Sequence, residues 1–268
     1  MLTETGDIMN YVGIDIGSTA SKVMTTGDIK THFVLPTGWS SKDTASDIKE
    51  KLLAQGIDVL DKENTVTVAT GYGRVAVDFS DYVITEITCH GRGGRELFGG
   101  DCSIIDVGGQ DTKVIIIENG VVCDFIMNDK CSAGTGKFIE IMANRLGVSL
   151  EEIFDMAKKG KVLPISSLCT VFAESEVISY IGEGKPREDI AAGVIDSVVN
   201  KVVSLCNKKR LGKDVILTGG LSFSPYFTKC LGDKLGVTIE PREMGRYAGA
   251  YGAALIGKEK HEKLDCNA

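Results

Sequence analysis

The pattern of apolar and polar positions predicts two β-hairpins that repeat each other. Residues 11–29 read YVGIDIGSTASKVMTTGDI, and residues 102–120 read CSIIDVGGQDTKVIIIENG. Each segment is an apolar run, an Asp-x-Gly turn, a second strand-like run and a turn that contains glycine. The residues that align are Asp15 with Asp106, Gly17 with Gly108 and Lys22 with Lys113. We therefore expect two similar hairpins, each with one carboxylate and several exposed backbone N–H groups at its tip.

A third glycine cluster follows a further buried-strand pattern. Residues 213–236 read KDVILTGGLSFSPYFTKCLGDKLG, which predicts a strand, a turn at Gly219 and Gly220, and then a helix. Near the end of the chain, residues 245–257 read GRYAGAYGAALIG, a run of small residues at helical spacing. Such a helix can pack closely against a neighbour because its side chains take little room.

Two single cysteines each precede a predicted helix. Cys131 opens CSAGTGKFIEIMANRLG, in which Phe138, Ile141, Met142 and Leu146 recur at helical spacing. Cys169 opens CTVFAESEVISYIG, in which Val171, Val177, Ile178 and Ile181 do the same. The N-terminus of a helix carries free N–H groups and a partial positive charge, so both sulfurs are expected at electropositive positions that favour a thiolate. On spacing alone, however, isolated cysteines are more often buried structural residues.

Composition narrows the class of protein. The chain has 268 residues, 43% hydrophobic and 25% charged, as expected of a soluble globular protein of one large or two medium domains. No stretch reaches the length of a membrane span, and the polar start MLTETGDIMN is not a secretory signal, so we expect a cytoplasmic location. A net charge of −7 argues against a nucleic-acid partner. Without export, the eight cysteines are expected to stay reduced.

The hairpin tips suit the phosphates of a nucleotide. Glycines and small hydroxyls let backbone N–H groups reach phosphate oxygens, and a carboxylate binds Mg²⁺ or its waters. The candidates for contact with the phosphates are Gly17, Ser18, Thr19, Lys22, Gly108 and Gly109, and those for Mg²⁺ are Asp15 and Asp106. Gly219 and Gly220 are candidates to border the adenosine. Gln110 is a hypothesis for the residue that positions the attacking water, since glutamine orients water but is a poor base.

These features together resemble the actin/hexokinase/Hsp70 ATPase superfold, an α/β fold of two lobes, each a mixed sheet with flanking helices. The segments GIDIGSTASK, ATGYGR, ITCHGRG, IDVGGQDTKVI, MNDKCSAGTGKF and SSLCTVFAESEVIS resemble the activator ATPases of 2-hydroxyacyl-CoA dehydratases. That family includes ATPase subunits of benzoyl-CoA reductases and reductases of double-cubane cluster proteins. We expect a first lobe at residues 1–100, which a helix at about 246–260 can complete, and a second lobe at 101–245.

The resemblance implies an ATPase coupled to electron transfer. In that family a homodimer holds one 4Fe–4S cluster, to which each chain gives two cysteines, here Cys131 and Cys169. Each subunit is expected to bind MgATP, as ATP or ADP, in the cleft between its lobes. Electrons from ferredoxin or flavodoxin would pass to an iron–sulfur acceptor, either a dehydratase or a double-cubane protein. An exposed cluster also implies an anaerobic host. Which acceptor is served does not follow from the sequence.

Two other functions stay open on the residues alone. One is a small-molecule kinase of the same superfold without a cluster, and the other is a nucleotide-driven protein switch. The other six cysteines are expected to be structural: Cys89, Cys102, Cys123, Cys206, Cys230 and Cys266. Helix packing is the favoured role for His90, dipole interaction for Glu174 and Glu176, and simple packing for Trp39, the only tryptophan.

Overall fold

The structure, a computed structural model, describes residues 9–166, 169–240 and 242–266. These residues form two units, which are the described parts of Met1–Gly100 with Tyr247–Ala268 (unit 1) and of Asp101–Arg246 (unit 2). At the centre of each unit lies a five-stranded mixed sheet, and the two sheets have the same topology. The sequence repeat therefore reflects two sheets built on one plan.

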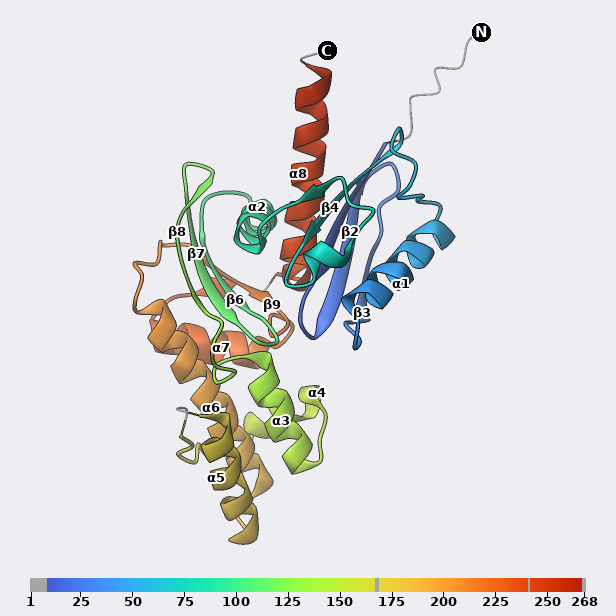
Figure 1. Ribbon diagram of the computed structural model, residues 1–268. Helices are drawn as coiled ribbons and strands as arrows, with labels where there is room; N and C mark the ends of the chain where they lie inside the picture. Colours follow the sequence, from blue (N-terminus) through green and yellow to red (C-terminus); the bar gives the residue numbers. More distant parts are fainter. Residues whose placement is uncertain (1–8, 167–168, 241, 267–268) are drawn as a thin grey trace. The chain divides into compact units, whose positions relative to one another are not determined.

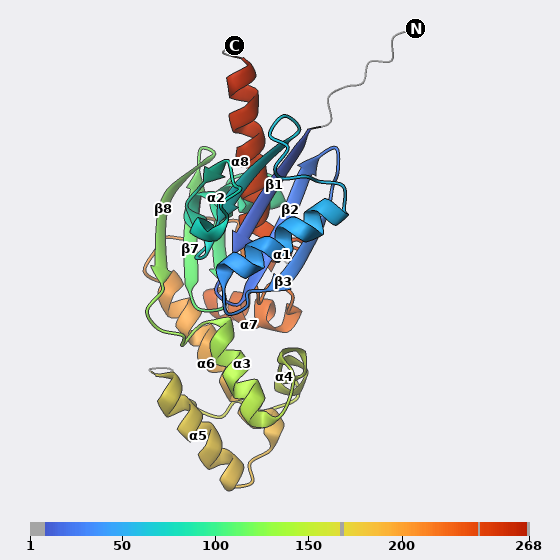
Figure 2. The same cartoon turned by 45° about the vertical axis from the view of Figure 1, so that its right-hand side comes forward.

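In unit 1 the central strand is β1, which pairs antiparallel with β2 and parallel with β4. Helix α1 covers one face of the sheet, and α8 lies on the other face with α2 packed along it (Figures 1 and 2). Strand β1 is buried along its whole length because both faces are covered. The bounds are β1 Asn10–Ile16, β2 Ala20–Gly27, β3 His32–Pro36, α1 Ser41–Ala54, β4 Thr65–Thr70, η1 Arg74–Ala76, β5 Tyr82–Val83, α2 Glu86–Phe98 and α8 Ala248–Asp265.

Glycines set how closely the last helix approaches its neighbours. A Cβ atom at Gly13 in β1 would overlap the carbonyl oxygen of Ala250, and one at Gly252 would overlap that of Cys89 in α2. Helix α8 therefore touches both β1 and α2 backbone to backbone. The predicted close packing of a small-residue helix is confirmed. This packing brings α2, the end of β1 and the start of α8 together.

Unit 2 repeats the plan with more helices. Its central strand β6 pairs antiparallel with β7 and parallel with β9. The apolar core joins the sheet to helices α3 to α7. The bounds are β6 Ser103–Val107, β7 Thr112–Glu118, β8 Val121–Asn128, α3 Gly136–Leu146, α4 Leu150–Ala157, α5 Thr170–Gly182, α6 Arg187–Cys206, β9 Val215–Gly219, α7 Pro225–Leu235, β10 Ile239–Glu240 and η2 Gly245–Tyr247.

Candidate functional site

The first predicted phosphate turn joins β1 to β2. Asp15 is the penultimate residue of β1, is 2% exposed and lies opposite Lys22 in the strand register. The Lys22 Nζ atom is 3.4 Å from Asp15 Oδ2. Gly17 and Ser18 are half-buried and Thr19 is exposed. The structure thus places a buried carboxylate beneath a turn whose residues reach the surface.

The second predicted turn, between β6 and β7, has the same plan. Asp106 lies opposite Lys113, and Lys113 Nζ is 3.4 Å from Asp106 Oδ2 and 2.8 Å from Asp111 Oδ2. Gly108 and Gly109 are half-buried, and Gln110 is exposed. The aligned Asp and Lys residues of the two hairpins therefore face each other in both units.

The parallel neighbour strand adds a matching threonine to each hairpin, which the sequence analysis missed. Thr70 in β4 is the register partner of Asp15, and Thr218 in β9 is that of Asp106. Thr218 donates a hydrogen bond to Asp106 Oδ1 at 2.7 Å. Among the described residues, Asp15 Oδ1 accepts no hydrogen bond, and Thr70 does not donate one to it. The two carboxylates therefore have similar strands around them but different contacts.

Helix α2 supplies a second group near Asp15 that sequence reasoning passed over. His90 is buried, and its Nε2 atom is 4.0 Å from Asp15 Oδ2 and 3.7 Å from Glu86 Oε1. The three side chains are close enough to hold a metal ion. His90 is packed within a helix as predicted, but it also borders the first phosphate turn. The available signal was the spacing of Glu86 and His90, which are one helical turn apart.

The two candidate cluster cysteines lie in neighbouring loops of unit 2. Both thiols are half-buried. The hydroxyls of Ser132 and Thr170, each the residue after a cysteine, are 2.8 Å apart. The Asn128 side chain donates a hydrogen bond to the carbonyl of Cys131 at 2.9 Å. Two segments far apart in sequence are thus joined next to their cysteines.

The helix positions of the cysteines are only partly as predicted. Cys169 is the N-cap residue of α5, as expected. Helix α3, however, has its N-cap at Thr135 and begins at Gly136, so Cys131 lies in the preceding loop. Cys131 thus precedes α3 as predicted, but the small residues directly after it do not open the helix, because SAGT forms a turn in which Gly134 has a φ of +89°.

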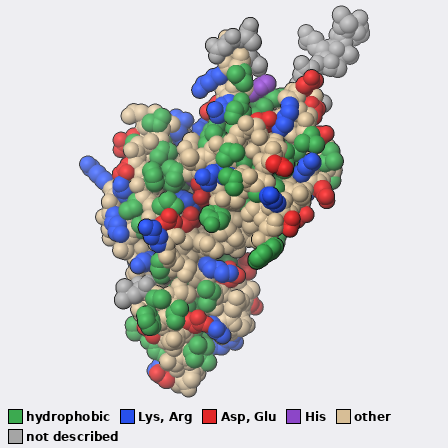
Figure 3. All heavy atoms as spheres, in the orientation of Figure 1, with side chains coloured by type: hydrophobic (Ala, Val, Ile, Leu, Met, Phe, Trp, Pro, Cys, Tyr) green, Lys and Arg blue, Asp and Glu red, His purple; other side chains and the backbone are tan. Residues whose placement is uncertain are grey.

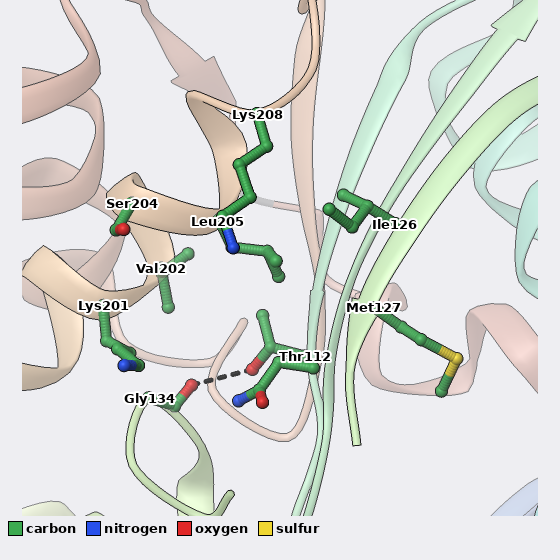
Figure 4. Close-up of a pocket in the computed structure, with 10 residues that line it drawn as sticks. Thr112, Ile126, Met127, Gly134, Lys201, Val202, Ser204, Leu205 and Lys208 are labelled. Carbon is green, nitrogen blue, oxygen red and sulfur yellow. Dashed lines mark hydrogen bonds between the residues drawn. The ribbon is translucent and has the colours of Figure 1, made fainter. Parts of the chain in front are cut away.

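The second phosphate turn is hydrogen-bonded to the segment that carries Cys131. The N–H groups of Gly136 and Lys137 donate to the carbonyls of Gly108 and Gly109, each at 2.9 Å. The buried hydroxyl of Thr112 donates to the carbonyl of Gly134 at 2.7 Å, the dashed line in Figure 4. Both N–H groups at the start of α3 are therefore used to bind the turn itself.

A small cavity lies behind this connection. It has a volume of about 180 Å³ and is bordered by Thr112, Asn128 and Gly134 on one side and, on the other, by Lys201 of α6 and Lys208, which follows the end of that helix. Figure 4 shows both lysines on the α6 side, across from Ile126 and Met127 of β8. The loop of Cys131 thus has open space next to it.

The third predicted motif has the expected local structure. Strand β9 ends at Gly219, whose φ is +85°, and a Cβ atom there would overlap the carbonyl oxygen of Val107. Gly220 is exposed, and α7 begins with Pro225 after the N-cap Ser224. Contact of these glycines with an adenosine stays a prediction.

Several other predictions need correction. Helix α5 forms as predicted, but of the four apolar residues that predicted it only Val177 is buried, whereas Val171, Ile178 and Ile181 are exposed. Cys123, Cys266 and Trp39 are exposed, so the predicted structural role of the two cysteines and the predicted packing of the tryptophan are wrong. Glu174 pairs with Arg145, and Glu176 accepts a hydrogen bond from the Ser166 N–H at 2.5 Å, so these acids have specific partners beyond the helix dipole. By contrast, burial raises the pKa of the Cys89 and Cys206 thiols to about 12, as suits structural cysteines.

Comparison with known proteins identifies the family. A model of the BadF/BadG/BcrA/BcrD ATPase family matches residues 12–257. The chain belongs to this family. The (R)-2-hydroxyglutaryl-CoA dehydratase activating ATPase of Acidaminococcus fermentans is 40% identical over 257 residues, which are 94% of this chain and 98% of the relative. A solved structure, the activator of the 2-hydroxyisocaproyl-CoA dehydratase from Clostridium difficile with bound ADPNP, has a TM-score of 0.87 at 34% identity and covers 97% of this chain and 98% of its own.

The comparisons also confirm the predicted fold class of this BadF/BadG/BcrA/BcrD ATPase. A ROK family glucokinase from Streptomyces griseus and MreB 5 of Spiroplasma citri each have a TM-score of 0.58 at 14% and 10% identity, so they share the fold alone. None of the described helices combines the length and the apolar character that a membrane crossing requires.

Proposed function

We propose that the protein is an ATP-dependent, one-electron activator. Two copies hold one 4Fe–4S cluster through Cys131 and Cys169 of each chain. ATP hydrolysis then drives low-potential electron transfer from ferredoxin or flavodoxin to an iron–sulfur partner. That partner is a 2-hydroxyacyl-CoA dehydratase or a double-cubane cluster protein. The proposal is supported by the relatives, which are named as activators of such dehydratases.

The observation that carries the proposal is a continuous path of hydrogen bonds from the second phosphate turn to both cysteine loops. Gly108 and Gly109 bind the start of α3, and Thr112 binds Gly134 in the loop of Cys131. Ser132 of that loop then meets Thr170, the residue after Cys169. A change in the turn when a γ-phosphate is bound or lost is thereby passed to both thiols.

The thiols fit an iron–sulfur cluster in chemistry and in number. Cubane clusters are held by four cysteine thiolates, so the two thiols of one chain are half a set, and a two-fold axis supplies the rest. Half-buried thiols can reach a second chain, whereas the buried Cys89 and Cys206 cannot. Once bound, the cluster would accept and release single electrons.

An exposed apolar helix supports pairing of two chains. The side chains of Val171, Phe172 and Ile178 on α5 are 65%, 66% and 51% exposed. Figure 3 shows hydrophobic side chains on the surface of unit 2 where α5 lies. This helix begins at Cys169, so a second copy that completes the cluster also covers the apolar face.

The nucleotide roles follow from the two turns. Asp15 and Asp106 organise Mg²⁺ through its waters. Backbone and hydroxyl groups of Gly17, Ser18, Thr19 and Gly109, with Lys22, bind phosphate oxygens, whereas the N–H of the predicted Gly108 already donates to the Asp111 carbonyl at 2.9 Å. Gln110 orients the attacking water, and Gly219 and Gly220 border the adenosine. Lys113 is not available for phosphate because it is 1% exposed and paired with Asp106 and Asp111. The first turn therefore supplies the accessible lysine.

Iron and sulfide analysis after anaerobic purification tests the proposal. We expect about four irons and four sulfides per dimer. Cys131→Ala and Cys169→Ala should each lose the brown colour and the iron but still bind ADP. Cys123→Ala is the matched control, since it removes an exposed thiol elsewhere in unit 2, and it should keep the full iron content.

Two results would contradict the proposal. One is a reconstituted wild-type protein without iron, and the other is a Cys131→Ala protein with the full iron content. If the wild type also phosphorylates an added small molecule, a kinase without a cluster becomes the better description.

A further inference from the structure

The two phosphate turns differ in what holds their carboxylates. In unit 2, Asp106 is held by the Thr218 hydroxyl and the buried Lys113, both of which come from neighbouring strands of the sheet. In unit 1, the register partner Thr70 makes no such hydrogen bond to Asp15 within the described part of the chain. Instead, helix α2 supplies a further neighbour of Asp15, His90. Asp15 therefore has contacts that the sequence repeat does not explain.

Helix α2 brings an imidazole and a second carboxylate to this place. Glu86 is the first residue of the helix after the N-cap Thr85, and His90 follows one turn later on the same side. His90 Nε2 is 3.7 Å from Glu86 Oε1 and 4.0 Å from Asp15 Oδ2, and the three side chains each bring one such atom within 4.8 Å of the others. On the other side, Lys22 Nζ is 3.4 Å from the same Asp15 oxygen. One carboxylate oxygen is thus approached by an ammonium and an imidazole.

In helix α8, Gly249 is the residue that lies against both His90 and Asp15. A Cβ atom at Gly249 would lie 2.7 Å from His90 Nε2 and 3.0 Å from Asp15 Oδ2. It would therefore occupy the gap between the two side chains. Any residue other than glycine here has to push His90 and Asp15 apart.

We propose that His90 is a positioning residue for ATP hydrolysis, which acts through Asp15 and is itself oriented by Glu86. The imidazole fixes the direction of the Asp15 carboxylate, and hence of the Mg²⁺ waters that this carboxylate holds. Glu86 fixes the imidazole from the outer side. The second turn needs no such group, because Thr218 and the buried Lys113 already hold Asp106. This inference depends on the ATPase reaction and on the proposed role of Asp15, but not on the cluster.

The ATPase kinetics of three variants test the proposal. His90→Leu removes the ring nitrogens, whereas His90→Gln keeps an N–H donor near the place of Nε2. We expect kcat to fall about 10- to 100-fold in His90→Leu, since misplacement by about 1 Å costs on that order. The KM for ATP should change by less than about twofold, since phosphate contacts are retained. His90→Gln should recover most of kcat, and Glu86→Gln should lie between the two.

Two glycine substitutions in helix α8 test the same contact without a change of His90 itself. Gly249→Ala places a methyl group between His90 and Asp15, and the flexible ends of these side chains can move, so the fold should persist. Gly257→Ala is the control, because its methyl group meets only Val68 and Val66. We expect Gly249→Ala to lose kcat as His90→Leu does, and Gly257→Ala to keep it. Iron content should be normal in all of these proteins.

Three outcomes would overturn the proposal. The first is wild-type kcat in His90→Leu, and the second is equal loss in His90→Leu and His90→Gln. The third is that the wild type binds Mn²⁺ tightly without nucleotide and that both His90 variants lose this binding. The group of Asp15, Glu86 and His90 would then be a metal site. A wild-type protein without iron would contradict the proposed 4Fe–4S cluster but not the proposed role of His90.

Discussion

Lys22 and Lys113 occupy equivalent positions in the two hairpins, but their surroundings differ. Lys113 is 1% exposed and lies near two carboxylates, whereas the Lys22 side chain is 17% exposed and near one. Removal of one partner from a buried ion pair costs about 3 to 5 kcal/mol, because the other charge is left without compensation. We expect the loss of Lys22 to cost less than the loss of Lys113, because Lys22 is partly exposed and Asp15 also has His90 as a neighbour.

We therefore expect Lys113→Met to lower the Tm of unit 2 by about 10 °C. Lys22→Met should lower the Tm of unit 1 by less than Lys113→Met lowers that of unit 2, but it should weaken ATP binding. Thermal unfolding and ATP titration of the two variants measure both effects. Equal losses of stability in the two proteins would show that the hairpins are equivalent, contrary to their difference in burial.

At this scale the repeat in sequence was sufficient to predict which residues face each other. Asp15 opposite Lys22 and Asp106 opposite Lys113 follow from hairpin geometry, which is local in the chain. His90 beside Asp15 was not predictable, because helix α2 reaches Asp15 only through packing against α8. The start of α3 after Cys131 was missed for another reason. A run of small residues supports a turn as well as the start of a helix, and here Gly134 adopts a positive φ.

Among the helices, α5 differs most from the expectation. Its apolar periodicity predicted the helix correctly but not which residues are buried. Ala173 and Val177 face the core, and Val171 and Ile178 lie on the opposite side. Periodicity reports that a helix has an apolar face but not what covers it. Helices that are apolar on both sides belong to a deep core or to an interface, and α5 is exposed.

If the exposed side of α5 joins two chains, a charge on it should separate them. Burial of an Ile side chain contributes about 1.5 to 3 kcal/mol, and a two-fold interface contains each substituted residue twice. Ile178→Asp should therefore weaken the dimer at least about 100-fold. Analytical ultracentrifugation of the anaerobic protein measures this change, and iron should be lost together with the dimer.

The control for Ile178→Asp is Val121→Asp, which places the same charge on another exposed apolar residue, in β8 (62% exposed against 51% for Ile178). This protein should remain dimeric with its iron. A dimer that persists in Ile178→Asp would show that the two chains meet elsewhere.

On the scale of the molecule, the two units share one sheet topology but differ in the helices and loops around it. Both sheets hold a carboxylate at the end of the central strand, opposite a lysine and beside a threonine. Unit 1 adds α2 and α8 around this carboxylate, and unit 2 adds the loops with the two cysteines. The shared plan was predictable because it is encoded by residues in local hairpins. The helices and loops around the sheets depend on contacts between segments that are distant in sequence, such as Ser132 with Thr170, and no pattern in one chain reveals them.

The link between phosphate turn and thiols predicts a variant that binds both ligands but does not couple them. Thr112→Val keeps the volume of the buried side chain and removes its hydrogen bond to Gly134, at a cost of about 1 to 3 kcal/mol. ATP binding and iron content should be retained. In the wild type, ATP should change the rate at which an iron chelator removes the cluster, because the turn moves the loop of Cys131. In Thr112→Val that response should shrink several-fold.

The control is Thr228→Val, which removes a similar hydroxyl-to-carbonyl hydrogen bond, to Ser224, within α7. Its chelation rate should respond to ATP as that of the wild type does. A full response in Thr112→Val would mean that the hydrogen bonds of Gly136 and Lys137 to the turn transmit the change without the threonine. A weakened response in both proteins would point to general loosening of unit 2. Only a loss confined to Thr112→Val ties nucleotide and thiols together through this one hydroxyl.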